Sequence, residues 1–144
     1  MTDRAAQTTL VSAPVEKCWS VVLDFERYPE WAHDVKEAVV RAHDDQGRPL
    51  RVEYRASALG RSTHYTLQYD YSEMPARLSW NLVEGDIMRA IDGAYSMVEV
   101  DGGTQVFYEL SIELVVPLPG FVKRRAEARI LIDAVKELKA RAEA

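Results

Sequence analysis

The feature that most constrains this chain is a period-two alternation of apolar and polar residues, which recurs in consecutive segments between residues 35 and 114. In one of these segments Val52 and Tyr54 alternate with Arg51, Glu53 and Arg55. Such alternation predicts β-strands with one buried face and one wet face. Turn-forming residues at 44–47, 60–61, 74–76, 84–86 and 101–103 divide the region into six predicted strands: 35–42, 50–58, 65–71, 78–82, 87–100 and 106–114.

Helical patterns flank these strands. A short strand over 7–11 is followed by Ser12 and Pro14, a candidate cap and first-turn proline for a helix over 14–23. A second short helix is expected around Pro29 and Trp31, and we expect these two residues to anchor it against the sheet rather than to touch a ligand. After two prolines, residues 121–142 predict one long helix whose apolar stripe comprises Phe121, Ala128, Leu131, Ile132, Val135 and Leu138.

The order of these elements predicts an α+β fold. Consecutive strands with short turns imply an antiparallel meander, and the final helix is the only predicted element long enough to cover the apolar face of the sheet. The length of 144 residues fits a single domain over 1–144. A sheet of about seven strands must curve to wrap one long C-terminal helix, and an apolar cavity can remain between them. We expect a bulge or sharp bend at Gly93, within the longest strand.

Charge and cysteine content exclude several classes of function. The formal net charge of −5 argues against nucleic acid as the main partner. The single cysteine, Cys18, allows neither an intramolecular disulfide nor a thiolate zinc cluster, and no two histidines lie at metal-ligand spacing. We therefore expect no metal and no cofactor.

The first residues lack the apolar run of a signal peptide, and no stretch reaches about 18 apolar residues. We therefore expect a cytoplasmic protein.

Three segments carry a resemblance to a known family. The first is SAPVEKCWSVVLDFERYPEWAHDVKEAVV, which contains an Asp-x-x-x-Tyr-Pro-x-Trp motif formed by Asp24, Tyr28, Pro29 and Trp31. The second is RLSWNLVEGDIMRAIDGAYSM. The third is GTQVFYELSIELVVPLPGFVKRRAEARI. The chain resembles the START-like (SRPBCC) superfamily, in its polyketide cyclase/dehydrase and lipid-transport branch, which includes coenzyme-Q-binding proteins. The resemblance implies a helix-grip fold with an apolar pocket.

The resemblance leaves three kinds of function open. The first is sequestration or transport of a small hydrophobic ligand, such as a lipid, quinone or polyketide-like aromatic molecule. The second is an aromatase/cyclase-type enzyme acting on a polyketide-like substrate, in which tyrosines and an arginine stabilise an enolate. The third is an interaction protein whose space between helix and sheet is filled by side chains.

Strand parity selects the candidate ligand-binding residues. The large aromatics predicted to face the helix are either pocket walls or an aromatic core. Arg89 shares parity with Tyr95 and Met97, so it is the inward candidate for holding a ligand carboxylate or enolate. The alternative is a surface or rim arginine paired with an acidic neighbour. His64 has the opposite parity and should face water. The complete set of predicted ligand-binding residues is Tyr54, Tyr65, Tyr69, Trp80, Arg89, Tyr95, Met97, Tyr108, Ala128 and Ile132.

A basic cluster opens the last helix. It comprises Lys123, Arg124, Arg125 and Arg129. One interpretation is a solvated helix face paired with Glu127. The other is transient contact with an anionic membrane surface. Cations at a helix N-terminus oppose the helix dipole, and this local cost to stability favours a functional reason for the cluster. We expect a monomer or a weak homodimer.

Overall fold

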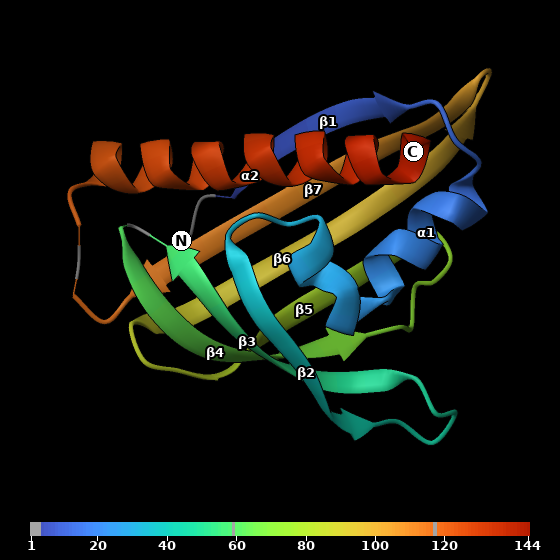
Figure 1. Ribbon diagram of the computed structural model, residues 1–144. Coiled ribbons are helices and arrows are strands. Elements are labelled where there is room, and N and C mark those ends of the chain that lie inside the picture. Colours follow the sequence, from blue (N-terminus) through green and yellow to red (C-terminus); the bar gives the residue numbers. More distant parts are fainter. Residues whose placement is uncertain (1–3, 59, 117) are drawn as a thin grey trace.

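Strands, a long helix and two short helices follow one another in the predicted order (Figure 1). The computed structural model describes residues 4–58, 60–116 and 118–144. The elements are β1 (Ala5–Val11), α1 (Val15–Leu23), the 3-10 helix η1 (Phe25–Glu30), β2 (Val35–His43), β3 (Pro49–Ala58), β4 (Arg61–Asp70), β5 (Arg77–Gly85), β6 (Met88–Val100), β7 (Gly103–Leu114) and α2 (Gly120–Glu143).

The strands form one antiparallel sheet in the order β1-β7-β6-β5-β4-β3-β2. Strands 2 to 7 are therefore a meander, and β1 closes the edge beside β7. The α+β helix-grip fold expected from the alternation is confirmed, including the two short helices after the first strand. The inward positions of the strands are buried, as the period-two pattern requires: in β3, Val52, Tyr54 and Ala56 are buried, whereas Glu53 and Arg55 are half-exposed.

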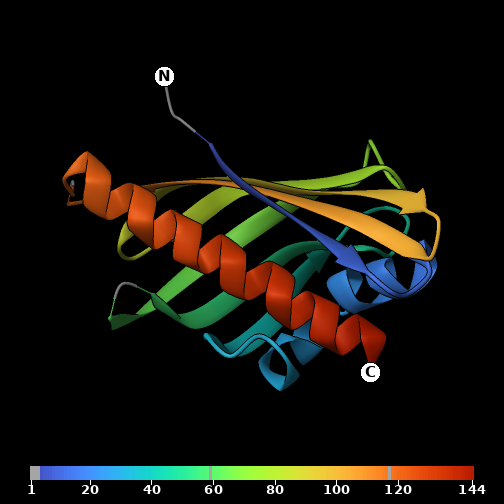
Figure 2. The same cartoon turned by 90° about the horizontal axis from the view of Figure 1, so that it is seen from above.

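The helix α2 lies on the side of the sheet formed by β1 and β7, and its C-terminal part also contacts α1 (Figure 2). Its buried apolar residues are Leu131, Val135, Leu138 and Ala142, which recur every three or four positions. The strands β2 to β5 curve away beneath it (Figure 1). The helix α2 thus does not cover the apolar face of that half, where η1 packs instead, with the Phe25 ring centroid 4.5 Å from that of Tyr69.

The start of α1 differs from the predicted cap. The N-cap is Pro14, and no side chain caps the helix. Ser12 serves another purpose, since its backbone N–H donates to the Glu143 carboxylate of α2 at 2.8 Å. This bond ties the β1–α1 connection to the end of the long helix.

The predicted bulge lies at a different position in β6. Gly93 is paired regularly, with Trp80 on β5 and Leu110 on β7. The register shifts instead between Met88 and Ala90, which pair with the successive residues Leu114 and Glu113. Arg89 is therefore the extra residue of the bulge, and the parity of the strand changes there.

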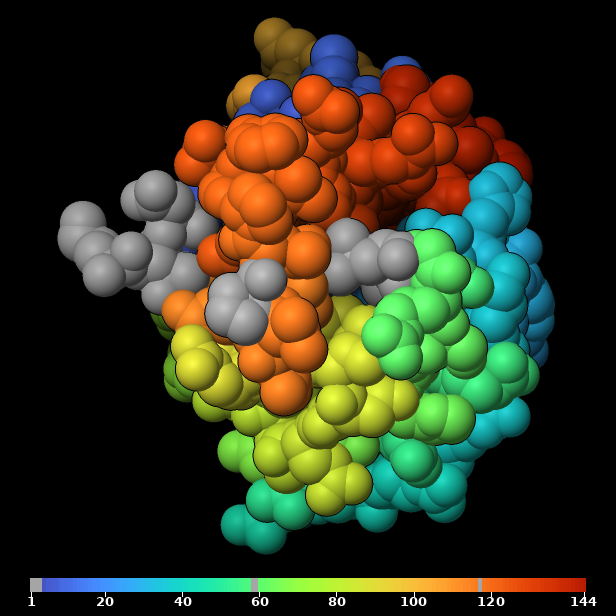
Figure 3. All heavy atoms as spheres, turned by 90° about the vertical axis from the view of Figure 1, so that its left-hand side faces the viewer, coloured from blue at the N-terminus to red at the C-terminus, as the bar shows by residue number. Residues whose placement is uncertain are grey.

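One end of the molecule brings the β7–α2 connection and the β5–β6 turn together (Figure 3). The Val115 N–H donates to the Ile87 carbonyl at 2.9 Å. The first turns of α2 form much of the surface at this end (Figure 3). In the described part of the chain, no helix is both long and apolar enough to cross a membrane.

Candidate functional site

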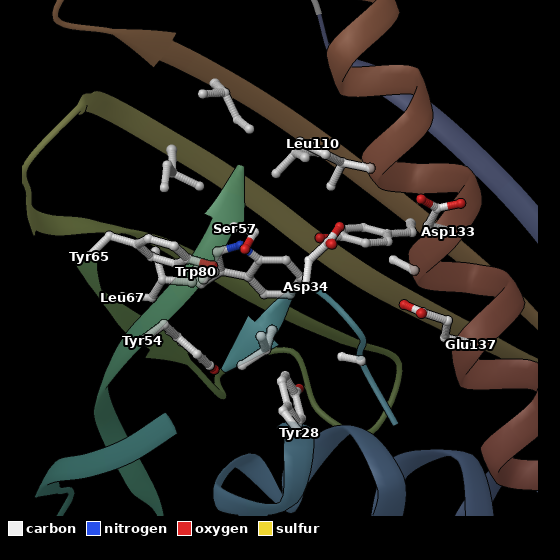
Figure 4. A pocket seen from close by; sticks show the side chains of 18 of the residues that line it. Tyr28, Asp34, Tyr54, Ser57, Tyr65, Leu67, Trp80, Leu110, Asp133 and Glu137 are labelled. Atoms are coloured by element: carbon white, nitrogen blue, oxygen red, sulfur yellow. The ribbon is translucent and has the colours of Figure 1, made fainter. Parts of the chain in front are cut away.

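A cavity of about 170 Å³ lies between the curved sheet and α2. This volume is several times the roughly 30 Å³ that one water molecule occupies in the liquid. Side chains from η1, the η1–β2 connection, the six strands β2 to β7 and α2 line it (Figure 4). The lining residues are Tyr28, Trp31, Ala32, Asp34, Val35, Tyr54, Ala56, Ser57, Tyr65, Leu67, Tyr69, Trp80, Met88, Ile91, Tyr95, Tyr108, Leu110, Ile112, Ile130, Asp133, Ala134 and Glu137.

Six of the ten predicted ligand-binding residues line this cavity, and all six are aromatic. Strand register explains why they meet, because Tyr54 pairs with Tyr65, Tyr69 with Trp80, and Tyr95 with Tyr108. Directly opposed residues on one sheet face touch. The ring centroids of these pairs are 5.4, 5.7 and 4.5 Å apart, respectively. The result is a continuous aromatic wall across β3 to β7.

Two predicted residues of β6 do not line the cavity. The side chain of Arg89 is 70% exposed and donates to the Glu113 carboxylate at 3.2 Å. The prediction that it faces inward is wrong, because the bulge breaks the alternation and Met88 takes the inward place. Met97 is buried, as parity predicts, but it belongs to the core outside the cavity lining.

The two predicted residues of α2 also lie elsewhere. Ala128 is exposed and Ile132 is 49% exposed. Successive helical residues are about 100° apart, so Ile132 points well away from the buried Leu131. The opposite flank of the helix, with Ile130, Asp133, Ala134 and Glu137, faces the cavity. Phe121, placed on the apolar stripe from sequence, is likewise 64% exposed.

Sequence reasoning missed several wall residues. Tyr28 and Trp31 of the η1 region line the cavity, with their ring centroids 5.0 Å apart. Trp31 is expected from sequence to anchor the short helix rather than touch a ligand, but the structure places it in the cavity wall. Asp133 and Glu137 were missed because they are charged, although their spacing of four on the flank of the apolar stripe was a usable signal.

The cavity tyrosines differ in their hydrogen bonding. The Tyr54 and Tyr69 hydroxyls are 2.6 Å apart and bond to each other. The Tyr28 hydroxyl donates to the Val22 carbonyl at 2.6 Å. Tyr95 and Tyr108 are more than nine-tenths buried, yet their hydroxyls have no hydrogen-bond partner among the described residues. No fully enclosed side-chain oxygen of the described chain lacks a partner, so these two hydroxyls border open space.

Burial keeps these phenols neutral. Removal from water raises the pKa of Tyr54, Tyr69, Tyr95 and Tyr108 well above the usual range. The same cause raises the pKa of Tyr65 to about 12. At neutral pH they are therefore hydrogen-bond donors rather than bases.

The ionisable groups of the cavity other than tyrosine are all acidic. Figure 4 shows Asp133 and Glu137 leaving α2 on the cavity side, and Asp34 reaching from the η1–β2 connection toward the same space. Asp34 is exposed, and the other two are half-buried, so they stand where the cavity meets solvent. We call these three residues the acidic mouth. None of the lining residues is a lysine, arginine or histidine.

The other candidates from sequence lie away from the cavity. His64 is exposed, as its parity predicts, and Cys18 is fully buried in the core. Burial raises the pKa of the Cys18 thiol. A raised pKa disfavours the reactive thiolate.

Comparisons with known proteins agree with this architecture. Residues 11–139 match the model of the family described as polyketide cyclase / dehydrase and lipid transport. A START superfamily protein from Mycobacterium smegmatis is 26% identical, with a TM-score of 0.92 and 97% of each chain covered. Among curated proteins no significant match was found.

Two more distant structures share the fold. The ZhuI aromatase/cyclase from Streptomyces sp. R1128 is 14% identical, with a TM-score of 0.85, covering 99% of this chain and 94% of its own. A protein from Thermus thermophilus is 20% identical, with a TM-score of 0.80 and 97% of each chain covered. The family match spans nearly the whole chain and includes the cavity walls. The chain belongs to the polyketide cyclase/dehydrase and lipid transport family of START-like proteins.

Proposed function

We propose that this protein binds and carries a small hydrophobic molecule in the cavity between the sheet and α2. The observation that carries the proposal is the aromatic wall, which leaves a lined space of about 170 Å³ where a filled core would otherwise be. Such pockets combine apolar walls with a few polar groups that orient a ligand. Here the free Tyr95 and Tyr108 hydroxyls supply donors for a carbonyl or hydroxyl oxygen.

A neutral fluorescent dye tests this binding function. N-phenyl-1-naphthylamine should bind the purified protein with a Kd on the order of micromolar, with enhanced emission. Ala134→Phe places a ring in the cavity and should weaken binding at least about tenfold. Ala140→Phe is the matched control, because Ala140 is exposed on the same helix. Equal dye affinity in the wild type and Ala134→Phe would contradict the proposal.

An aromatase/cyclase-type activity is the alternative function. Its support is the presence of neutral phenol donors and the Glu137 carboxylate in one cavity, which could stabilise an enolate oxygen and accept a proton. Incubation with a linear poly-β-carbonyl thioester, followed by mass spectrometry, tests it through loss of water on cyclisation. The loss should disappear in Tyr95→Phe/Tyr108→Phe. If the wild type only retains the compound unchanged, the carrier function stands and the enzyme function fails.

We also propose that the protein touches an anionic membrane surface with the end that carries the basic cluster. Arg124, Arg125 and Arg129 are exposed and have no ion-pair partner among the described residues. Next to them Val116 and Phe121 are 72% and 64% exposed. A small hollow under this end shares Met88, Ile112 and Ile130 with the main cavity. Exposed apolar groups beside cations suit a lipid surface, and we propose the hollow as the place where a ligand enters from that surface.

Vesicle co-sedimentation tests this contact. Binding should require phosphatidylserine in phosphatidylcholine vesicles and should weaken with salt. Each basic residue near such a surface contributes about 1 kcal/mol, so Arg124→Gln/Arg125→Gln should lower binding roughly tenfold or more. Lys17→Gln is the control, because Lys17 is exposed on α1, at the opposite end of the molecule (Figure 1). Equal binding of both variants would contradict the proposal.

A further inference from the structure

The acidic mouth carries negative charge that the described part of the chain leaves largely uncompensated. Neither the Asp34 nor the Asp133 carboxylate has an ion pair or side-chain hydrogen bond among the described residues. Glu137 accepts the His33 backbone N–H at 3.2 Å and contacts the His33 imidazole.

Four cationic residues flank the mouth along the chain: Lys36, Arg129, Lys136 and Arg141. Arg129 and Lys136 are exposed and form no ion pair among the described residues. The Lys36 ammonium donates to the His33 carbonyl at 2.9 Å, and Arg141 pairs with Glu30 at 2.9 Å. Neither lines the cavity. None of the four cations pairs with Asp34, Asp133 or Glu137, so among the described residues His33 is the only basic side chain in contact with the mouth.

A second, independent observation comes from inside the cavity. Tyr95 and Tyr108 are only 6% and 9% exposed, and their hydroxyls find no partner among the residues that the structure describes. Both hydroxyls border the open cavity. Donors that the protein leaves unpaired and that border the cavity are available to the polar group of a ligand.

The aromatic walls and the acidic mouth favour the same ligand charge. Ring faces attract cations, and the attraction grows as the site loses water. Carboxylates attract the same cations and repel anions, with limited screening where they are half-buried. A carboxylate-bearing molecule would meet three like charges at the mouth and no lysine, arginine or histidine in the walls.

We propose that the cavity selects an apolar aromatic molecule that carries a protonated amine, with its rings against the tyrosine wall and its nitrogen at Asp34, Asp133 and Glu137. This inference rests on the proposed binding function and names the chemical class of the ligand. It reverses the charge expected when Arg89 was taken as an inward residue. The same geometry disfavours fatty acids and other anionic lipids as cargo of this cavity.

Three naphthalenes of nearly equal size test the inference by isothermal titration calorimetry. They are 2-naphthylmethylamine, 2-naphthylmethanol and 2-naphthoate, which are cationic, neutral and anionic at neutral pH. The amine should bind roughly fivefold to tenfold more tightly than the alcohol, and the carboxylate most weakly. In Asp34→Asn/Asp133→Asn/Glu137→Gln the ratio of amine to alcohol affinity should fall to near one. Glu99→Gln removes an exposed carboxylate outside the cavity and should leave the ratio unchanged.

Binding of the neutral alcohol distinguishes failure of this inference from failure of the proposed binding function. If the alcohol binds and the amine binds no better, the inference is overturned and the binding function stands. If the triple variant keeps the wild-type ratio, the nitrogen does not sit at the acidic mouth and the inference also fails. If none of the three compounds binds, both proposals fail. Because the ratio is taken within each variant, a modest loss of folded protein does not alter its meaning.

Discussion

At Gly93 the absence of a side chain makes room for one wall of the cavity. A β-carbon built there would lie 2.5 Å from two atoms of the Trp80 indole, well inside contact distance. Trp80 is the cross-strand partner of Gly93, so its ring lies over the glycine backbone. From there it reaches Tyr95 and Tyr108, with centroid separations of 5.4 and 5.7 Å. The aromatic wall is thus continuous because one strand residue has no side chain.

Gly93→Ala should therefore disturb both stability and the cavity. Overpacking a tight site costs about 1–3 kcal/mol, which denaturant unfolding would measure. Displacement of Trp80 should also shift the tryptophan emission and weaken binding of the neutral dye. Ser96→Ala, on the same strand and outside the cavity lining, is the control. Unchanged stability and emission in Gly93→Ala would show that Trp80 does not depend on this contact.

Glu127 is a buried carboxylate with a structural partner. It is 4% exposed and accepts the Ile112 backbone N–H at 2.8 Å. The pairing of β7 with β1 ends at Leu110 and Ala5, so Glu127 receives an N–H beyond the reach of β1. The Lys123 ammonium lies 4.0 Å away. Glu127, assigned from sequence to the solvated face of the helix, thus satisfies a backbone N–H of β7 that β1 does not pair with.

Glu127→Leu should destabilise the protein because it leaves the Ile112 N–H without an acceptor. An unsatisfied buried backbone donor costs about 1–3 kcal/mol. Glu127→Gln keeps an acceptor oxygen and should cost less than Glu127→Leu. Thermal unfolding of both variants measures the difference. If Glu127→Leu matches the wild type, the hydrogen bond has no net stabilising role.

Among the elements, the bulge in β6 had the largest effect on the predicted site. It makes Met88 an inward residue and Arg89 an outward one.

This exchange of positions predicts different effects for substitutions at the two residues. Arg89→Met breaks an exposed pair worth up to about 1 kcal/mol and should leave dye binding unchanged. Met88→Ala removes a 4%-exposed side chain and should cost about 2–5 kcal/mol while altering dye affinity. Dye titration and denaturant unfolding of the two variants check this, and loss of dye binding in Arg89→Met would contradict the assignment.

The bulge also shows where prediction from sequence stops. Tyr54 and Tyr65 follow the simple alternation, because no register shift separates them in the β3–β4 pairing. Nothing in the residues around Arg89 distinguishes a regular strand from one with an extra residue, since the shift is fixed by pairing with β7. Similarly, the length of α2 was readable from its pattern. Which flank of its stripe faces the cavity depends on how the helix docks against β1 and β7.

At the scale of the whole molecule, all seven tyrosines share one electrostatic property. Burial raises the pKa of every one above 10.0, to about 12 for Tyr65 and Tyr71. A raised folded-state pKa contributes stability that is complete below the unfolded value of 10.0 and is lost as pH rises through the folded values. The protein should therefore unfold in alkali as its phenols ionise.

Ultraviolet titration of phenolate absorbance measures this behaviour. We expect few tyrosines to ionise near pH 10, followed by one steep step that coincides with loss of the circular dichroism of the sheet. Tyr71→Phe serves as a control, because Tyr71 donates to the Pro49 carbonyl and does not line the cavity. It should lower the amplitude and keep the steepness. A gradual titration centred near pH 10 in folded protein would contradict the burial of these residues.

The one-sided docking of α2 has a consequence for the lifetime of the protein. Its contacts are concentrated on β1, β7 and α1, whereas the wall formed by β3, β4 and β5 faces the cavity. A bound molecule would bridge the two halves and complete the core. By mass action, a ligand at a hundred times its Kd stabilises the folded state by about 2.7 kcal/mol. Empty protein would then open more often and be the preferred target of proteases, so the supply of ligand would set how much of the protein persists.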